Sequence, residues 1–128
     1  MSSARVSFLA LCLAAGLAGP AAAEVQSFVV IANGEKVGHL TADVQGRKVA
    51  VDYAVSNNGR GPKAKEAIEL DASGVPVSWS IDGSSLFGSP VQERFAWSAG
   101  QAQWTSQADK GQVAAARPIL YAANDASP

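Results

Sequence analysis

The amino-acid sequence predicts an all-β protein: an antiparallel meander of about seven to eight strands, forming a curved open sheet or a partial barrel, after a cleaved signal peptide. Apolar and polar residues alternate with a period of two in several segments, as they do in half-buried strands. Turn residues separate these segments at intervals of about 8–12 residues, which is typical of antiparallel sheets. No window keeps a helical period, and 128 residues leave room for one small domain.

The N-terminal residues have the pattern of a secretory signal peptide, which we assign to 1–23. Arg5 supplies the positive charge, residues 6–17 are an uncharged apolar run, and Ala21-Ala22-Ala23 fits the small-residue cleavage rule. The run is too short to cross a bilayer, which needs about 20 apolar residues. We therefore expect no membrane span, cleavage after Ala23, and export to the periplasm or the medium.

Cys12 has two interpretations. A bacterial lipoprotein signal has a small residue before its Cys, whereas Leu11 precedes Cys12, so a dispensable Cys within the apolar run is favoured over a lipid-modified one. Cleavage after Ala23 then leaves a chain without Cys, which suits an oxidising compartment.

The first half of the exported chain predicts three strands joined by tight turns. Asn33-Gly34 lies between the apolar segments 25–32 and 36–44, and Asn-Gly is the strongest two-residue hairpin signal. Gln45-Gly46 precedes a third strand. Its alternating apolar positions are Val49, Val51, Tyr53 and Val55.

The second half predicts the remaining strands. A weaker alternation contains Glu66, Ile68 and Leu70. After the turn at 71–74, a clear alternation contains Val75, Val77, Trp79 and Ile81. After the turn at 82–84, the pattern is repeated by Val91, Phe95 and Trp97. Ala99-Gly100 marks the next turn, and residues 119–123 are the candidate for an eighth strand.

We divide the exported chain into an antiparallel β-domain over 24–107 and a linker or extended arm over 108–128, which is rich in Ala, Gly and Pro. A single sheet leaves one face open unless another layer covers it. Trp79, Ile81, Phe95 and Trp97 share strand parity, so they form one apolar patch if their strands are neighbours. We therefore expect an uncovered interface and a tendency of the isolated chain to self-associate.

Charge and composition exclude several function classes. The formal net charge is -1 and no basic stripe is visible, so we expect no nucleic-acid partner. One His and one Cys exclude paired-His and Cys-rich metal sites. A catalytic triad could use only His39, which we interpret as a residue on an open sheet face. We assign no catalytic, cofactor-binding or metal-binding residue, and expect no hydrolase activity and no bound zinc in this chain.

The loop 57–62 is the most distinctive polar segment. Arg60, together with successive backbone N–H groups near Gly, either cradles an anion or carboxylate, or the loop is a wide hairpin turn that needs positive φ at Asn58 or Gly59. The hairpin interpretation is favoured.

Acidic residues on the predicted strands are the next candidates. Glu93 shares the parity of Phe95, so we expect it on the covered face, where a carboxylate would need a partner such as Arg60 or Lys63. Its neighbour Arg94 has the opposite parity.

Two other carboxylates, Glu66 and Glu69, have opposite positions on their strand, and we interpret both as solvated charges.

Trp79, Trp97 and Trp104 either line a ligand site or form the core of a small sheet, and the core interpretation is favoured. The candidate loop or interface residues are therefore Asn58, Arg60, Glu93, Arg94, Trp79 and Trp97.

Several segments carry a family resemblance: SFVVIANGEKVGHL, VDYAVSNNGRGPKAKEAIELDASGVPVSWSIDG, SPVQERFAW and SQADKGQ, followed by a late Tyr and a closing Ser-Pro. In this order they resemble the N-terminal region of secreted bacterial amidohydrolases of the imidazolonepropionase-like type. The resemblance covers 25–128, and its most specific pieces are 58–62 and 93–95. It implies a β-rich segment that precedes a catalytic barrel with a divalent metal, most often zinc.

The resemblance carries no catalytic residue over to this chain. The family's His-x-His pair, further His residues, Asp and modified Lys lie on the barrel, and this sequence holds no such positions. The first functional interpretation is therefore a non-catalytic accessory β-domain, a leading piece whose partner is a C-terminal catalytic barrel. The alternative is a stand-alone periplasmic β-protein that binds a small apolar or amphipathic ligand.

Overall fold

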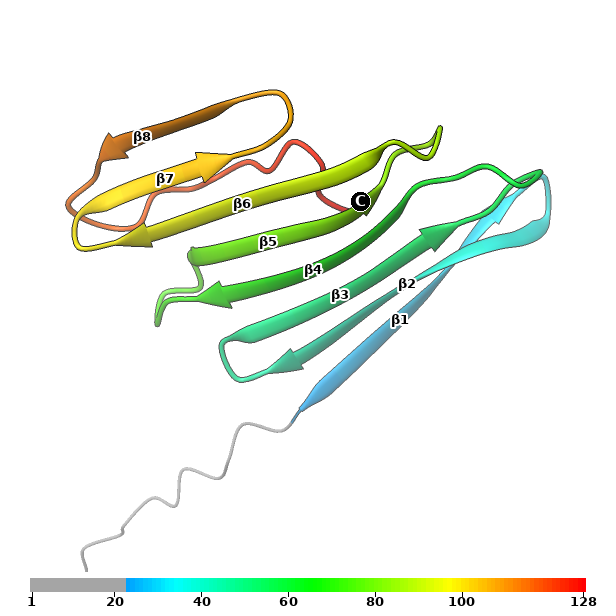
Figure 1. The fold of residues 1–128 in the computed structure, drawn as a ribbon. Coiled ribbons are helices and arrows are strands. Elements are labelled where there is room, and N and C mark those ends of the chain that lie inside the picture. The colour runs from blue at the N-terminus through cyan, green and yellow to red at the C-terminus, as the bar shows by residue number, and fades with distance from the viewer. Residues whose placement is uncertain (1–22) are drawn as a thin grey trace, which may run out of the picture.

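A computed structural model describes residues 23–128; the predicted signal peptide up to residue 22, with Cys12, lies outside the described residues. Eight strands form one antiparallel sheet in sequence order (Figure 1). Their bounds are β1 Glu24–Ala32, β2 Glu35–Gln45, β3 Lys48–Val55, β4 Lys63–Leu70, β5 Pro76–Ser84, β6 Pro90–Ser98, β7 Gln101–Thr105 and β8 Lys110–Ala114. The predicted all-β meander is confirmed, and the sheet is open, with β1 and β8 as its edges.

The last strand differs from the prediction. β8 spans Lys110–Ala114 and pairs with β7, whereas residues 119–123 form no strand. The segment KGQVA shows little apolar alternation. It pairs with β7 over five positions, and the ring of Trp104 lies over Gly111, directly opposite it in register. An aromatic ring that covers a glycine on an edge strand stabilises that strand without a side chain of its own.

Short turns fix the register of the neighbouring strands. Asn33 and Gly34 have φ values of 52° and 81°, and Asn58 and Gly59 have values of 53° and 74°. Positive φ at both central residues is the geometry of a tight hairpin turn whose twist matches that of the flanking strands. The favoured hairpin interpretation of the 57–62 loop therefore agrees with the structure.

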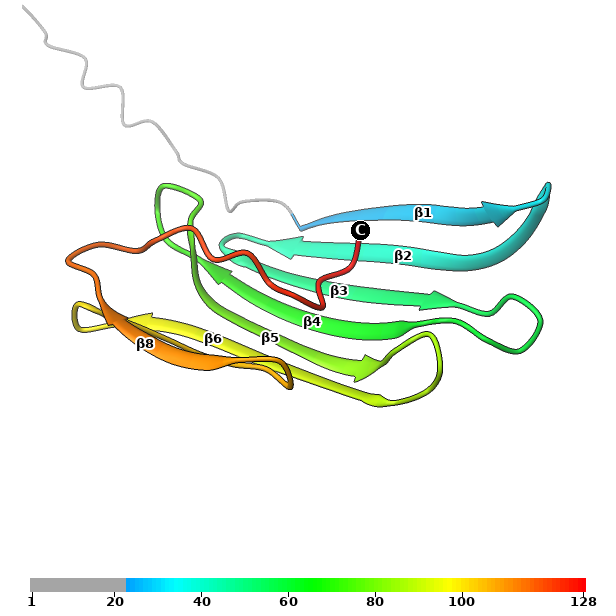
Figure 2. The same cartoon turned by 90° about the horizontal axis from the view of Figure 1, so that it is seen from above.

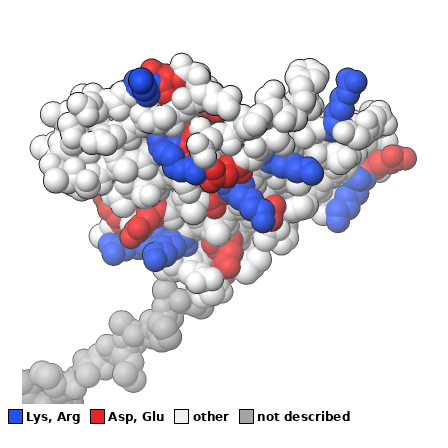
Figure 3. Space-filling model, in the orientation of Figure 1, with Lys and Arg blue, Asp and Glu red and all other residues white. Residues whose placement is uncertain are grey.

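The register gives the sheet two different faces. On one face, directly opposed positions of β3 to β6 carry Val51, Glu66, Ile81 and Glu93. We call this the arm-side face, because residues 115–128, the arm, cross it after β8 (Figure 2). On the other face, the polar face, Lys65 lies opposite Asp52 and Asp82. Figure 3 shows acidic and basic side chains interspersed on the molecule in this view.

The core is thin and lies under the arm. The buried apolar residues are Ala64, Ile81, Phe95 and Ala102, and the buried charged residues are Glu66 and Glu93. All six lie on β4 to β7, on the arm-side face. The arm therefore serves as the second layer that a single sheet requires, but over only part of its width.

Candidate functional site: the arm-side face

The arm is fixed first where it leaves β8. The indole Nε1 of Trp97, on β6, donates a hydrogen bond of 2.9 Å to the backbone oxygen of Ala115. Trp97 has the same strand parity as Phe95 and Glu93, so the contact lies on the arm-side face. A residue singled out in the sequence thus holds the start of the arm.

Glu93 is the main anchor of the arm. Glu93 is only 1% exposed. Its carboxylate accepts a hydrogen bond of 2.5 Å from the Tyr121 hydroxyl and hydrogen bonds of 3.0 Å from the backbone N–H groups of Asn124 and Asp125. A buried carboxylate is costly unless hydrogen-bond donors replace its water shell. Here the donors come from the arm, so Glu93 can be buried only when the arm is packed against the sheet, and the carboxylate in turn holds the arm there.

Glu66 repeats this arrangement two strands away. One carboxylate oxygen accepts the indole N–H of Trp79 at 2.9 Å, and the other accepts the backbone N–H of Ser127 at 2.6 Å. Glu66 and Glu93 both lie opposite Ile81, one on each side. Neighbouring strands are about 4.8 Å apart, so the two carboxylates form a row that the arm crosses from strand to strand.

An aromatic stack completes the contact. The rings of Tyr121 and Phe95 are 4.4 Å apart between centroids and 9° from parallel. Burial raises the pKa of the Tyr121 hydroxyl above its ordinary value, and its hydrogen bond to Glu93 raises it further. The stack contributes apolar burial, and the hydroxyl contributes a donor to the carboxylate beside it.

Two predictions about these carboxylates are wrong. Glu93 does lie on the covered face, but its partners are arm groups and not Arg60 or Lys63. Glu66 is 5% exposed and is not a solvated charge, although Glu69 is exposed as predicted. Strand parity gives the face on which a side chain lies, whereas the donors come from a segment up to 61 positions away in the sequence.

Sequence reasoning did not identify Tyr121 as a member of this site. For Glu66, the strand alternation that it shares with Ile68 and Leu70 is the sequence signal that predicts a position on the apolar face.

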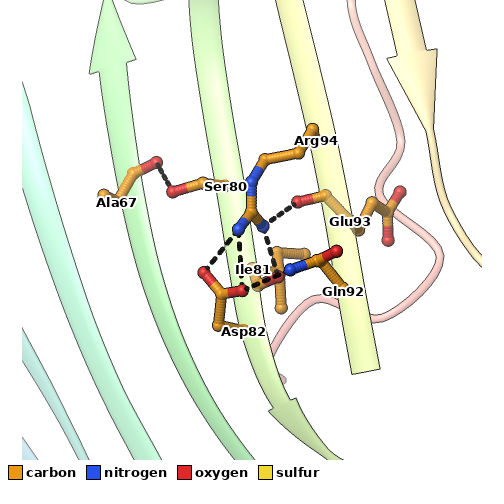
Figure 4. Close-up of polar contacts among 7 residues, drawn as sticks. All are labelled: Ala67, Ser80, Ile81, Asp82, Gln92, Glu93 and Arg94. Carbon is orange, nitrogen blue, oxygen red and sulfur yellow. Dashed lines mark hydrogen bonds and ion pairs between the residues drawn. The ribbon is translucent and has the colours of Figure 1, made fainter. Parts of the chain in front are cut away.

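Arg94 belongs to the polar face. Its Nη2 donates to both carboxylate oxygens of Asp82, at 2.7 and 2.8 Å, and its Nη1 donates to the backbone oxygens of Ile81 and Glu93 (Figure 4). The hydrogen bond from Arg94 lowers the pKa of Asp82 below its ordinary value. These contacts join β5 to β6, so Arg94 has a structural role away from the arm.

Asn58 and Arg60 lie at one end of the sheet, away from the carboxylate row. The backbone groups of Asn57 and Arg60 exchange hydrogen bonds of 2.7 and 3.1 Å, which close the β3–β4 turn. The six predicted residues are therefore distributed over three places. Trp79, Trp97 and Glu93 lie on the arm-side face, Arg94 on the polar face, and Asn58 and Arg60 in the turn.

The β1 to β3 part of the arm-side face is less covered. Opposed positions there carry Phe28, Leu40 and Tyr53. Further along the same face, Val51 lies opposite Ala42, and Val44 lies opposite Val49. Phe28 is 56% exposed, and the others named are only half-buried. We call this part the bare half, in contrast to the covered half on β4 to β7.

His39 is exposed on the polar face, where its Nε2 lies 3.4 Å from a carboxylate oxygen of Asp52. Within 23–128, no group of three or more His, Cys, Asp or Glu side chains is placed to hold a metal ion. The same residues include no helix long and apolar enough to cross a bilayer.

Comparison with protein-family models, with curated proteins and with solved structures finds no match for this chain.

Proposed function

We propose that this chain is a non-catalytic accessory β-domain of an exported amidohydrolase-like hydrolase, and that it packs against the catalytic barrel through the bare half. The single observation that supports this most strongly is the asymmetry of the sheet. From β2 to β7 the polar face carries mostly polar and charged side chains, whereas the arm-side face carries the buried apolar residues and is covered by the arm on one half and accessible on the other.

The position of the arm supports the same proposal. After Ser127 contacts Glu66 on β4, the chain reaches Pro128, which lines a cavity together with Tyr53 of β3. The arm therefore leads from the covered half toward the bare half. Contiguous exposed apolar patches on a protein surface often mark interaction sites. On the basis of the family resemblance, we propose that the partner is a metal-dependent barrel, in which the catalytic residues and the metal would lie.

A pair of substitutions on neighbouring residues tests the proposal. Leu40→Glu places a charge on the bare half, and Thr41→Glu places the same charge on the polar face of the same strand. Both are titrated, as the full exported chain, against a recombinant imidazolonepropionase-like barrel that lacks its own leading β-segment. We expect the wild type and Thr41→Glu to bind and Leu40→Glu to lose binding by about 10-fold or more. Absence of wild-type binding, or equal binding by both variants, contradicts the proposal.

The alternative function, binding of a small apolar or amphipathic ligand, has one observation in its favour. The cavity between the end of the arm and β3 to β6 has a volume of about 390 Å³ and is lined in part by Tyr53, Ala64 and Val91. Such a volume suits a small ligand. Saturable binding of a fluorescent fatty acid by the wild type, lost in Tyr53→Ala, would favour this alternative.

A further inference from the structure

Two loops meet at one end of the sheet and form a second cavity. The β3–β4 loop carries Arg60, and the β5–β6 loop carries Leu86 and Phe87. Lys63 and Ser84 are paired in the ladder between β4 and β5, which holds the two loops side by side. The cavity between them has a volume of about 440 Å³. We call Arg60, Lys63, Leu86 and Phe87 the tip site.

The charge of the tip site is of one sign. Arg60 and Lys63 are the ionisable side chains that line this cavity, and both residues are exposed. The ion pairs of the described chain join His39 and Lys65 to Asp52, and Arg94 to Asp82, so they involve neither residue. The cations therefore remain available to a ligand with negative charge.

The apolar part of the tip site is held out into solvent. Leu86 is 51% exposed and Phe87 is 80% exposed. Their loop is closed by backbone hydrogen bonds, from Ser85 N–H to the Ser89 oxygen at 2.8 Å and from Gly88 N–H to the Ser85 oxygen at 3.0 Å. These bonds fix the backbone of the loop on which Leu86 and Phe87 are exposed.

An adjacent pair of cations and a pair of projecting apolar side chains match one surface in particular. We propose that the tip site docks on a bilayer surface with anionic phosphate headgroups. Leu86 and Phe87 enter the boundary between headgroups and acyl chains, and Arg60 and Lys63 contact the phosphates. The whole chain has a formal net charge of -1, so its overall charge does not draw it to an anionic surface, and the local arrangement has to supply the attraction.

Sedimentation with lipid vesicles tests this proposal. The full exported chain is mixed, at low ionic strength, with vesicles of phosphatidylglycerol and phosphatidylcholine, or of phosphatidylcholine alone. We expect partitioning onto the anionic vesicles that falls about 30-fold in R60Q/K63Q, because each cation near an anionic surface contributes about 1 kcal/mol. In L86S/F87S we expect a loss of about 10-fold or more. These residues are exposed, so the variants keep the fold, which circular dichroism checks.

The matched control removes the same charge from the polar face. K48Q/K65Q neutralises two exposed lysines of β3 and β4 and is expected to partition within about 3-fold of the wild type. Failure of the wild type to bind anionic vesicles overturns the proposal. An equal loss in K48Q/K65Q, or unchanged binding by L86S/F87S, also overturns it, because either result indicates general electrostatic attraction. Saturable binding of inorganic phosphate without vesicle binding identifies the cavity as a small-anion site instead.

Discussion

The partners of Glu66 and Glu93 are neutral hydrogen-bond donors and not cations. This determines which segment of the chain the two carboxylates bind. An Arg or Lys partner would have given each carboxylate a local ion pair within the sheet. Backbone N–H groups of Asn124, Asp125 and Ser127 instead make each carboxylate a receptor for an extended segment. Hydrogen bonds to a charged acceptor contribute about 1.5–3 kcal/mol each, so the arm is held firmly although it forms no strand.

At this scale we predict that Glu93→Gln weakens the fold. The amide keeps the size of the side chain but removes the charge, and its NH₂ group is brought close to N–H donors. We expect a loss of about 2–4 kcal/mol in the free energy of unfolding, measured by urea denaturation. Glu69→Gln, exposed on the same sheet, is the control and should change it by less than about 0.5 kcal/mol. Equal stability of the two variants would show that the arm is not seated on Glu93.

Tyr121 makes the stability depend on alkaline pH. Its pKa is raised in the folded state, so the folded chain holds the phenolic proton more tightly than the unfolded chain does. The stabilisation from the Tyr121 hydroxyl is complete below the unfolded pKa of about 10 and is lost as the pH rises through the folded pKa. We expect the free energy of unfolding to fall more steeply above about pH 10 in the wild type than in Tyr121→Phe. Parallel pH profiles would contradict this.

At the scale of elements, the strands and turns follow from sequence and the last segment does not. The alternation around Val51 and Ile81, and the Asn33-Gly34 turn, predict strands and a hairpin that the structure contains. The strand Lys110–Ala114 lacks that alternation, and the ring of Trp104 on the neighbouring strand lies over its glycine. The path of the arm depends on contacts between residues distant in the sequence, such as Ser127 with Glu66, which local periodicity does not contain.

Gly83 gives an element-scale prediction. A Cβ added there would collide with the backbone of Lys63 and Ala64 on β4, which cannot move as a flexible side chain can. We expect Gly83→Ala to separate β4 from β5 locally and to lower the free energy of unfolding by about 2 kcal/mol or more. Ser78→Ala, exposed on the same strand, is the control for thermal and urea unfolding. A Gly83→Ala variant as stable as the control would refute the close approach.

At the scale of the whole molecule, the open sheet has two unequal edges. β8 is short, whereas β1 is 9 residues long and carries Val25, Val29 and Ile31, each more than half exposed. A long apolar edge strand is a template for pairing with another chain, and a Lys on such an edge prevents it. The prediction of an uncovered patch at Ile81 and Phe95 is wrong, because the arm buries both residues. If copies of the chain associate, we expect the contact at the β1 edge instead.

We expect Val29→Lys to lower the concentration-dependent association of residues 24–128. Sedimentation velocity over a range of concentrations measures it, and Gln112→Lys on β8 is the matched control. If both variants associate as the wild type does, the contact between copies lies elsewhere than β1.

The arm covers one half of the arm-side face, and we propose that the other half is accessible to a partner domain. Carbene labelling of residues 24–128, read by mass spectrometry, measures both halves in one experiment. We predict strong labelling of Phe28 and Leu40 and protection of Ile81 and Phe95, with Phe28 and Leu40 becoming protected when the barrel is added. Strong labelling of Ile81 and Phe95 in the free chain, or unchanged labelling of Phe28 and Leu40 with the barrel, would contradict the claim.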